Sequence, residues 1–316
     1  MKEYKLIFKP ISTISKLPSA QTIFGAVCNI ILNTQGEEAF NNYIKSFDNN
    51  PLFIHSSMFP LNMLPMVHYN IFDIKYINQH ILKEKSIDQL SYLQTLKSYK
   101  KINYVTDSVY QNYIVNQNFD LLRNDILSKK LKIENYCLLE KNDNGHFEQI
   151  SQLNTHVRKK DYYVSDSDNN ALYYDNTIYT NGLFYILVKT NNIENVKKIF
   201  SYSHYFGFGS RHSVGKNSFE LLSIEEVKRN NNSKNKLLLS QSILDETVDL
   251  KSSNYQIISR QYHPSKTYVN KITHRLNLFN EGSYLNVLQN KEWIGELLSF
   301  NIDNKPLYYY GIGYII

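Results

Sequence analysis

A stretch of fifteen residues, 205–219, concentrates the residue types that bind anions. It holds three of the eleven glycines of this 316-residue chain, together with arginine, lysine, histidine and serine. Glycine adopts positive φ angles and lets the backbone approach a ligand closely, and successive amide N–H groups in such a loop form an anion-binding concavity. The predicted chemistry is the binding of phosphate, either free or in a nucleic-acid backbone. The candidate binding residues are Gly207, Gly209, Ser210, Arg211, His212, Ser213, Gly215 and Lys216.

This stretch, the glycine loop, differs from the two common nucleotide-binding motifs. A P-loop has four residues between its glycines and a serine or threonine after its lysine, whereas five residues separate Gly209 from Gly215 and Asn217 follows the lysine. The Gly-x-Gly-x-x-Gly pattern also fails, because His212 stands in place of the third glycine. A tight turn with solvated basic residues explains the composition without a ligand and stays an alternative.

The flanking segments predict a helix before the glycine loop and a strand after it, the reverse of the order around a P-loop. Apolar residues recur at helical spacing over 192–202. Asn191 and Glu194 have the spacing of a capping box at the start of that helix. Residues 218–222 have the composition of a strand.

Other segments supply the remaining elements of a ferredoxin-like unit. We predict a strand over 4–9, a helix over 19–32, and two strands over 172–180 and 183–190 joined by a hairpin turn. The turn is Asn181-Gly182, a strong hairpin signal. With the helix and strand around the glycine loop, the order is βαββαβ. Gly25, inside the first helix, suggests close packing against a neighbouring element.

The rest of the chain gives weaker signals. A second helix is expected over 39–47, an irregular segment over 51–66, a basic helical segment over 76–104 and an irregular polar region over 105–170. Residues 226–236 are rich in Asn and Lys and predict an exposed linker. Strands are expected after it, over 237–243, 255–262 and 307–316.

Composition limits the classes of protein. The formal net charge of +6 suits a polyanionic partner, and the 26 Tyr and 16 Phe could stack on bases, although AT-rich coding also raises such counts. Cys28 and Cys137 lie far apart, which indicates neither a zinc site nor a disulfide framework. No stretch approaches 18 apolar residues. We expect a soluble, cytoplasmic protein without a membrane partner, cofactor or metal.

The order of elements and the residues of the glycine loop resemble a known family. The chain has a predicted helix, then a loop of the form Gly-x-Gly-x-Arg-x-Ser-x-Gly-Lys at 207–216, then a predicted strand. This arrangement resembles the glycine loop of the RAMP superfamily of CRISPR antiviral proteins. The most similar members are the crRNA 5′-tag-binding subunits of type III-A (Csm) effector complexes. The segment Ser-Ala-x-x-x-Phe-Gly-Ala at 19–26 also resembles a recurrent helix start in this superfamily.

The resemblance implies an α+β fold of two tandem ferredoxin-like (RRM-like) units. The first would cover 1–225, with a thumb-like insertion at about 50–170, and the second, degenerate unit would cover 226–316. Because a helix N-terminus can face RNA phosphates, the RNA site would include residues at the start of the first helix, and it would extend to the insertion. These additional RNA-binding residues are Ser19, Gln21, His156, Arg158 and Lys159.

The resemblance also implies function and partners. The protein would be a non-catalytic RNA-binding subunit that holds the 5′ tag of the crRNA and caps the backbone filament. Its protein partners would be the large subunit, with polymerase/cyclase and HD nuclease domains, and the adjacent RAMP backbone subunit.

The alternative is a metal-independent endoribonuclease of the same fold that processes CRISPR repeat RNA. Such a reaction needs a general base near a 2′-OH and an acid or cation opposite it. Of nine histidines, only His212 lies among the glycines of the loop, with His204 just upstream. The early stretch 11–16 has no Asp or Glu, whereas target-cleaving backbone subunits use an acidic residue there. We therefore favour the non-catalytic function.

Overall fold

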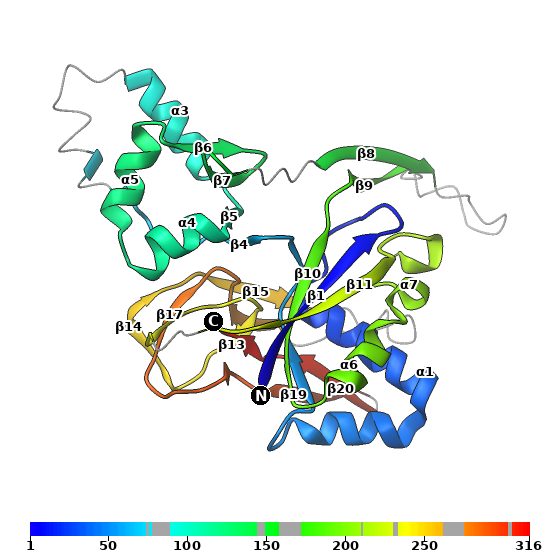
Figure 1. The fold of residues 1–316 in the computed structure, drawn as a ribbon. Helices are drawn as coiled ribbons and strands as arrows, with labels where there is room; N and C mark the ends of the chain where they lie inside the picture. Colours follow the sequence, from blue (N-terminus) through cyan, green and yellow to red (C-terminus); the bar gives the residue numbers. More distant parts are fainter. Residues whose placement is uncertain are drawn as a thin grey trace, which may run out of the picture.

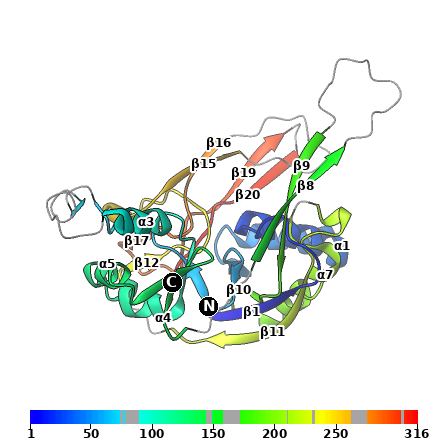
Figure 2. The same ribbon diagram turned by 90° about the horizontal axis from the view of Figure 1, so that it is seen from above.

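The computed structural model describes residues 1–73, 76–77, 89–143, 149–157, 172–209, 211–229, 233–261, 275–302 and 305–316. It shows a mixed α+β protein with a central antiparallel sheet (Figure 1). Helices cover one face of this sheet, a lobe formed by an insertion lies to one side, and a long hairpin projects from the body (Figure 2). No helix in these ranges is long and apolar enough to cross a membrane.

The central sheet has the strand order β11-β1-β10-β2, and every neighbouring pair is antiparallel. Strand β3 extends the β2 side by pairing with β10. One helix follows β1 and another lies between β10 and β11, so this sheet has the connectivity of a βαββαβ unit. Its strands are β1 (Lys2–Pro10), β2 (Phe53–His55), β3 (Phe59–Pro60), β10 (Phe184–Thr190) and β11 (Phe219–Val227).

The sequence explains why β1 and β10 occupy the centre of this sheet. In β1, Leu6 and Phe8 are fully buried and lie two residues apart, as expected for one face of a strand. In β10, residues 184–188 are all buried, which is the pattern of a strand covered on both faces. Phe8 contacts the rings of Phe200 and Phe208, so the core joins the sheet to the helix and loop that follow β10.

Three helices pack on the same face of the sheet. Helix α1 (Ala20–Ser46) contacts both α6 (Ile193–Phe200) and α7 (Ser203–Phe206) (Figure 1). The backbone of α1 is interrupted at Gly36, which has a φ of 89°, so the two predicted helices are the two halves of α1. A β-carbon at Gly25 would meet nothing within 4 Å. The close packing that we expected at Gly25 is therefore wrong.

The start of α6 differs by one residue from the predicted capping box. Asn192 is the N-cap, and its side-chain oxygen accepts a hydrogen bond of 3.1 Å from the backbone N–H of Asn195. Asn191 does not have this role, because the chain enters the helix one residue later than the predicted box requires. The helix itself and its buried face, Val196, Ile199 and Phe200, agree with the prediction.

The predicted pairing of 172–180 with 183–190 is wrong. Strand β9 (Leu172–Thr180) pairs along its whole length with β8 (Gln149–Val157) instead. The reason is the position of β10, since β1 occupies one of its edges and β2 and β3 occupy the other. With both edges of β10 paired, β9 must find another partner, and β8 and β9 form the projecting hairpin (Figure 2).

An inserted lobe lies between β3 and β8. A four-stranded sheet of order β4-β5-β7-β6 packs with short helices there. The irregular region predicted over 105–170 is wrong, because helices and strands occupy much of it. Of the basic segment 76–104, residues 78–88 lie outside the described ranges. The elements are β4 (Met63–Pro65), α3 (Gln89–Tyr99), β5 (Tyr104–Thr106), α4 (Asp107–Val109), the π-helix η1 (Tyr110–Val115), α5 (Phe119–Leu127), β6 (Leu131–Glu134) and β7 (Cys137–Glu140).

We predicted that the insertion covers about 50–170 and so begins at about residue 50, but in the structure it begins after β3. Strands β2 and β3 fall inside that range, yet they belong to the central sheet. The same strands lie in the segment 51–66 that we predicted to be irregular. Prolines mark breaks in this segment but do not prevent short strands, and β3 itself ends at Pro60.

The described residues from 233 onwards contain strands and no helix, and the strands form several small antiparallel sheets. A second ferredoxin-like unit requires two helices, so that unit stays a prediction. The strands are β12 (Asn235–Leu237), β13 (Ser242–Ile243), β14 (Val248–Asn254), β15 (Ile257–Gln261), β16 (Arg275–Phe279), β17 (Tyr284–Val287), β18 (Trp293–Ile294), β19 (Leu297–Ile302), β20 (Lys305–Tyr310) and β21 (Gly313–Tyr314).

The C-terminal strands share a core with the first sheet. Tyr310 at the end of β20 stacks on His55 of β2, with ring centroids 4.6 Å apart, and on Phe24 of α1 at 5.2 Å. The backbone N–H of Tyr310 donates to the side-chain oxygen of Gln21 at 2.6 Å. These contacts fix the C-terminal part of the chain against the start of α1, which lies beside the glycine loop.

Candidate nucleic-acid interface

All three glycines of the loop have the backbone conformation that the sequence predicted. Gly207, Gly209 and Gly215 have φ angles of 61°, 101° and 82°, a region that favours glycine. Arg211 also lies in the left-handed region, with φ of 67°. The loop continues through a short 3-10 helix, η2 (His212–Val214), before the chain enters β11. The glycines therefore set the path of the loop.

The glycine loop touches the start of α1. A β-carbon at Gly209 would lie 2.6 Å from Cγ2 of Thr22, and one at Gly207 would lie 2.9 Å from Cβ of His212. This contact and the packing of α1 on α7 show that the first helix and the glycine loop share one side of the sheet. The loop folds back over the helix start because glycine leaves room for it.

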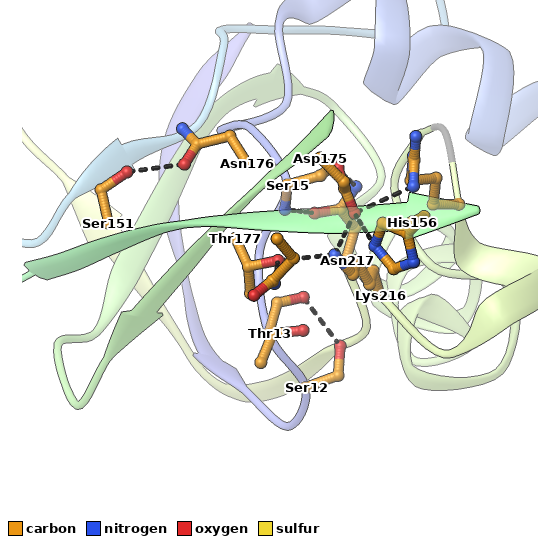
Figure 3. A network of polar contacts seen from close by, with 12 residues as sticks. Ser12, Thr13, Ser15, Ser151, His156, Asp175, Asn176, Thr177, Lys216 and Asn217 are labelled. Atoms are coloured by element: carbon orange, nitrogen blue, oxygen red, sulfur yellow. Dashed lines mark hydrogen bonds and ion pairs between the residues drawn. The ribbon is translucent and has the colours of Figure 1, made fainter. Parts of the chain in front are cut away.

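Asn217 fastens the end of the loop to the segment that follows β1. Its side-chain oxygen accepts from the backbone N–H of Ser15 at 2.9 Å, and its amide nitrogen donates to the hydroxyl of Ser15 at 2.8 Å. Its own backbone N–H donates to the carbonyl of Thr13 at 2.9 Å (Figure 3). Asn217 is 2% exposed. The residue that replaces the serine or threonine of a P-loop therefore has a structural role.

The two basic residues of the loop meet a carboxylate on β9. Lys216 donates to Oδ2 of Asp175, and Nη1 of Arg211 lies 2.9 Å from the same oxygen (Figure 3). Nε2 of His156, on β8, lies 4.0 Å from it. Asp175 is 6% exposed, and the hydrogen bond from Lys216, with the positive charges of Arg211 and Lys216, lowers the pKa of its carboxyl group. We call Asp175, Arg211, Lys216 and His156 the Asp175 cluster.

Sequence reasoning missed Asp175 and its neighbour Thr177. Thr177 is buried and accepts hydrogen bonds from Lys216 at 2.7 Å and from the side chain of Asn154 at 2.8 Å. The available signal was the period of a strand, because Asp175 and Thr177 are two residues apart and so share a face of β9. The sequence placed β9 beside β10 and gave no reason to bring that face to the glycine loop.

The structure brings together only some of the predicted RNA-binding residues. His212 is exposed, and its Nδ1–H donates to the carbonyl of Gly209 at 3.0 Å, within the loop. The hydroxyls of Ser19 and Thr22 are 3.1 Å apart at the start of α1. Gln21 has a contact that we did not expect, since it accepts from the backbone of Tyr310. The predicted residues Arg158, Lys159 and Ser210 lie outside the described residues, and the side chain of Ser213 is also not described.

The cluster has cationic and hydrogen-bonding groups but no arrangement for a metal. Among the residues that the structure describes, no group of three or more His, Cys, Asp or Glu is placed to hold a metal ion. Two permanent cations and one carboxylate leave the Asp175 cluster with a formal charge of +1 before any contribution from His156. Chemically, such a site can attract an anion and orient it with the donors of the loop.

Comparisons with known proteins concern the whole chain. No family model matches it, and no curated protein matches it. It is similar to a chain in a crystal structure of the Csm3-Csm4 subcomplex of a type III-A CRISPR-Cas interference complex, with a TM-score of 0.66 and 17% identity. That match covers 100% of this chain and 98% of the other. Crystal structures of a Csm1-Csm4 cassette with pppApA and with cA4 match 99% of this chain and 97% of theirs. Both have a TM-score of 0.55, with 16% and 17% identity.

Csm4 is the component that these three structures have in common. The chain has the fold of Csm4. The resemblance that the glycine loop suggested is thereby confirmed for the fold, over the full length of the chain. At this level of identity the likeness extends to the fold alone.

Proposed function

We propose that the protein is the crRNA-binding, non-catalytic Csm4-type subunit of a type III-A CRISPR complex, and that its glycine loop holds the 5′ tag of the crRNA. The observation that carries this proposal is the loop itself, in which three glycines with positive φ angles fold basic residues over the start of α1. The Csm4 fold of the whole chain supports it.

The chemistry of the loop suits single-stranded RNA. Phosphate contacts fix the position of a nucleic acid, and Arg211, at the partly exposed edge of the cluster, is the side chain best placed to supply one. Two exposed rings of the glycine loop, Tyr205 and His212, could stack on splayed bases of a tag. The formal charge of +6 over the chain favours association with a polyanion.

The similar structures suggest the protein partners. One of these structures is a subcomplex of Csm4 with Csm3, and others are cassettes of Csm4 with Csm1. By analogy we propose that this chain docks an adjacent RAMP backbone subunit and the large subunit with polymerase/cyclase and HD domains, and that it caps the 5′ end of the filament in the cytoplasm. We also propose a division into a first unit, 1–225, and a reduced second ferredoxin-like unit, 226–316.

Two features support a non-catalytic subunit. The segment after β1 uses Ser12 and Ser15 in hydrogen bonds with the loop and has no carboxylate. In the loop, the Nδ1 of His212 is engaged with Gly209, which leaves the ring with Nε2 for any proton transfer. Transesterification needs a general base near the 2′-OH and an acid or cation opposite it, and His212 by itself supplies only one of these groups.

The test compares RNA with and without the tag. The chain is purified together with its backbone and large subunits, and the 5′ ends of the RNA that co-purifies are sequenced. The Kd of the purified chain is then measured with a tag-bearing RNA and with an RNA whose tag sequence is scrambled. A constant 5′ sequence in the co-purified RNA and tighter binding of the tag-bearing RNA support the proposal, and equal affinity for the two RNAs overturns tag recognition.

The role of the loop is tested with a matched pair of variants. Arg211→Ala should weaken binding of the tag RNA about tenfold and reduce the salt slope by about 0.7, the value for one contact on a single strand. Lys132→Ala removes the same charge from an exposed position on β6 of the inserted lobe and should leave both quantities unchanged. Cleavage of repeat RNA by the wild type that is lost in His212→Ala would instead establish the endoribonuclease.

A further inference from the structure

One carboxylate oxygen of Asp175 occupies the place where an anion would meet both cations of the glycine loop. Lys216 and Arg211 reach Oδ2 of Asp175 from the loop, and His156 approaches the same atom from β8 (Figure 3). A carboxylate and a phosphate offer similar oxygen acceptors to lysine and arginine. The ion pair therefore competes with the phosphate that the proposed function assigns to this loop.

The two cations of this cluster are held differently. Lys216 is 15% exposed and has a second acceptor on β9, the hydroxyl of Thr177 at 2.7 Å. Thr177 is itself fixed by Asn154 on β8. Lys216 thus ties the loop to the β8-β9 hairpin with two contacts to buried groups.

Arg211 lies further out than Lys216. Its side chain is 35% exposed against 15% for Lys216, and its Nη1 lies 2.9 Å from Oδ2 of Asp175. Arg211 has a left-handed backbone conformation and is the residue directly before the 3-10 helix η2. If Arg211 moves from Asp175 to a ligand, Lys216 still compensates the charge of the buried carboxylate. If Lys216 moves, the buried oxygen loses the donor that most stabilises its charged form.

We propose that Asp175 is a positioning residue that holds Arg211 in the RNA-free protein and releases it to a phosphate of the bound RNA, while Lys216 stays on β9. This inference rests on the proposed function of the loop. Each binding event then exchanges one ion pair for another, so the carboxylate lowers the affinity for every polyanion. Only an RNA that makes further contacts with the loop offsets that loss, so that at a given RNA concentration Asp175 keeps weakly binding RNAs off the loop while tag RNA stays bound.

The decisive variant is Asp175→Asn, which keeps the size of the side chain and removes its charge. We expect this variant to bind RNA about tenfold more tightly, the order of magnitude of one charge-assisted contact released for the ligand. Scrambled-tag RNA should gain about as much affinity as tag RNA, so that the variant binds it at concentrations at which the wild type binds only tag RNA. The measurement is the Kd of each RNA at several salt concentrations, with the wild type alongside.

A matched control is available in the inserted lobe. Asp125 on α5 is also buried and pairs with a lysine, Lys130, at 3.0 Å, and its other oxygen accepts from Tyr113. Asp125→Asn changes the net charge by the same amount and should leave the Kd of both RNAs unchanged. Equal tightening in the two variants would show a general effect of net charge and would overturn the inference.

A second pair of variants tests the exchange if Asp175→Asn does not fold. Arg211→Gln should weaken RNA binding with little change in the melting temperature, whereas Lys216→Gln should lower the melting temperature clearly. RNA affinity that survives in Arg211→Gln, or equal losses of stability in both variants, would overturn the proposed division between these two residues.

The outcomes separate this inference from the proposed function. A wild type that does not distinguish tag RNA from scrambled RNA counts against the proposed function. A wild type that binds tag RNA selectively, combined with unchanged or weaker binding by a folded Asp175→Asn variant, counts against the exchange alone. In that case Asp175 only orients the loop.

Discussion

Gly209 and Thr22 meet where the glycine loop folds over the first helix. A β-carbon at Gly209 would lie 2.6 Å from Cγ2 of Thr22, closer than carbon atoms normally approach. Gly209 also has a φ of 101°, which side chains rarely adopt. The position is therefore restricted to glycine by conformation and by contact at once, and the loop can lie on α1 only while both conditions are met.

Substitution at Gly209 should displace the loop from α1. We expect Gly209→Ala to destabilise the protein by about 1–3 kcal/mol, from backbone strain and the contact with Thr22, and to weaken binding of tag RNA. The control is Gly25→Ala, because a β-carbon there meets nothing within 4 Å and alanine favours a helix. Thermal denaturation of both variants is the measurement, and similar melting temperatures for the two would contradict this account.

Gly215 differs from Gly209 because space is available around it. A β-carbon at Gly215 would meet nothing within 4 Å, but φ is 82°. Asparagine tolerates the left-handed region better than β-branched residues do, so Gly215→Asn should retain most of the stability and RNA affinity. Gly215→Val should lose about 1–2 kcal/mol of stability. Equal behaviour of the two variants in urea denaturation and RNA binding would show that the φ angle is not the constraint.

Loss of Lys216 should cost more stability than loss of Arg211. Lys216 is 15% exposed and pairs with a carboxylate that is 6% exposed, whereas the side chain of Arg211 is 35% exposed. We expect Lys216→Met to lower the free energy of unfolding by about 2 kcal/mol, and Arg211→Met by about 1 kcal/mol or less. Lys132→Met, at an exposed position of β6, is the control in the same denaturation experiment.

His55 should make stability depend on pH between about 4 and the ordinary histidine value. Burial lowers the pKa of His55 from 6.5 to about 4, and its Nε2 is a buried atom without a hydrogen bond in the described structure. The unfolded chain therefore binds a proton first as the pH falls. Above pH 6.5 His55 does not lower the free energy of unfolding. As the pH falls from 6.5 to about 4, the free energy of unfolding decreases by about 2–3 kcal/mol because the unfolded chain binds the proton more readily.

The matched variant for this pH dependence is His55→Phe. Phenylalanine keeps a ring to stack on Tyr310, which lies 4.6 Å from the His55 ring, and it cannot titrate. The difference in unfolding free energy between the wild type and the variant should change over this pH interval and be constant above it. A difference that does not vary with pH would mean that His55 is not the titrating group.

Local signals were sufficient for several elements of this fold. The sequence predicted β1, the helix before the glycine loop and the strand after it, because hydrophobic periodicity and caps act within a few residues. The positive φ angles of Gly209 and Gly215 were also predictable, because glycine is the residue that adopts positive φ in tight loops at little steric cost. The resemblance of 207–216 to the RAMP glycine loop predicted the similarity to the Csm4-containing structures.

The partner of β9 was decided by the rest of the sheet. Asn181-Gly182 is a local turn signal, and local signals favoured a hairpin of β9 with β10. Strand β10 instead pairs with β1 on one edge and with β2 and β3 on the other, and strands separated by more than a hundred residues make those pairs. The pairing of a strand depends on which edges remain available, and that is a property of the whole fold.

The composition of the candidate site shows the same division. The sequence by itself determined which residues of the loop are basic and where its backbone can turn. Only the tertiary structure brought Asp175, which lies 41 positions before Lys216, to the same point, and placed Tyr310 on His55 across 255 positions. Charge pairing and burial depend on distance in space, so no window of sequence contains them, whereas a backbone angle belongs to a single residue.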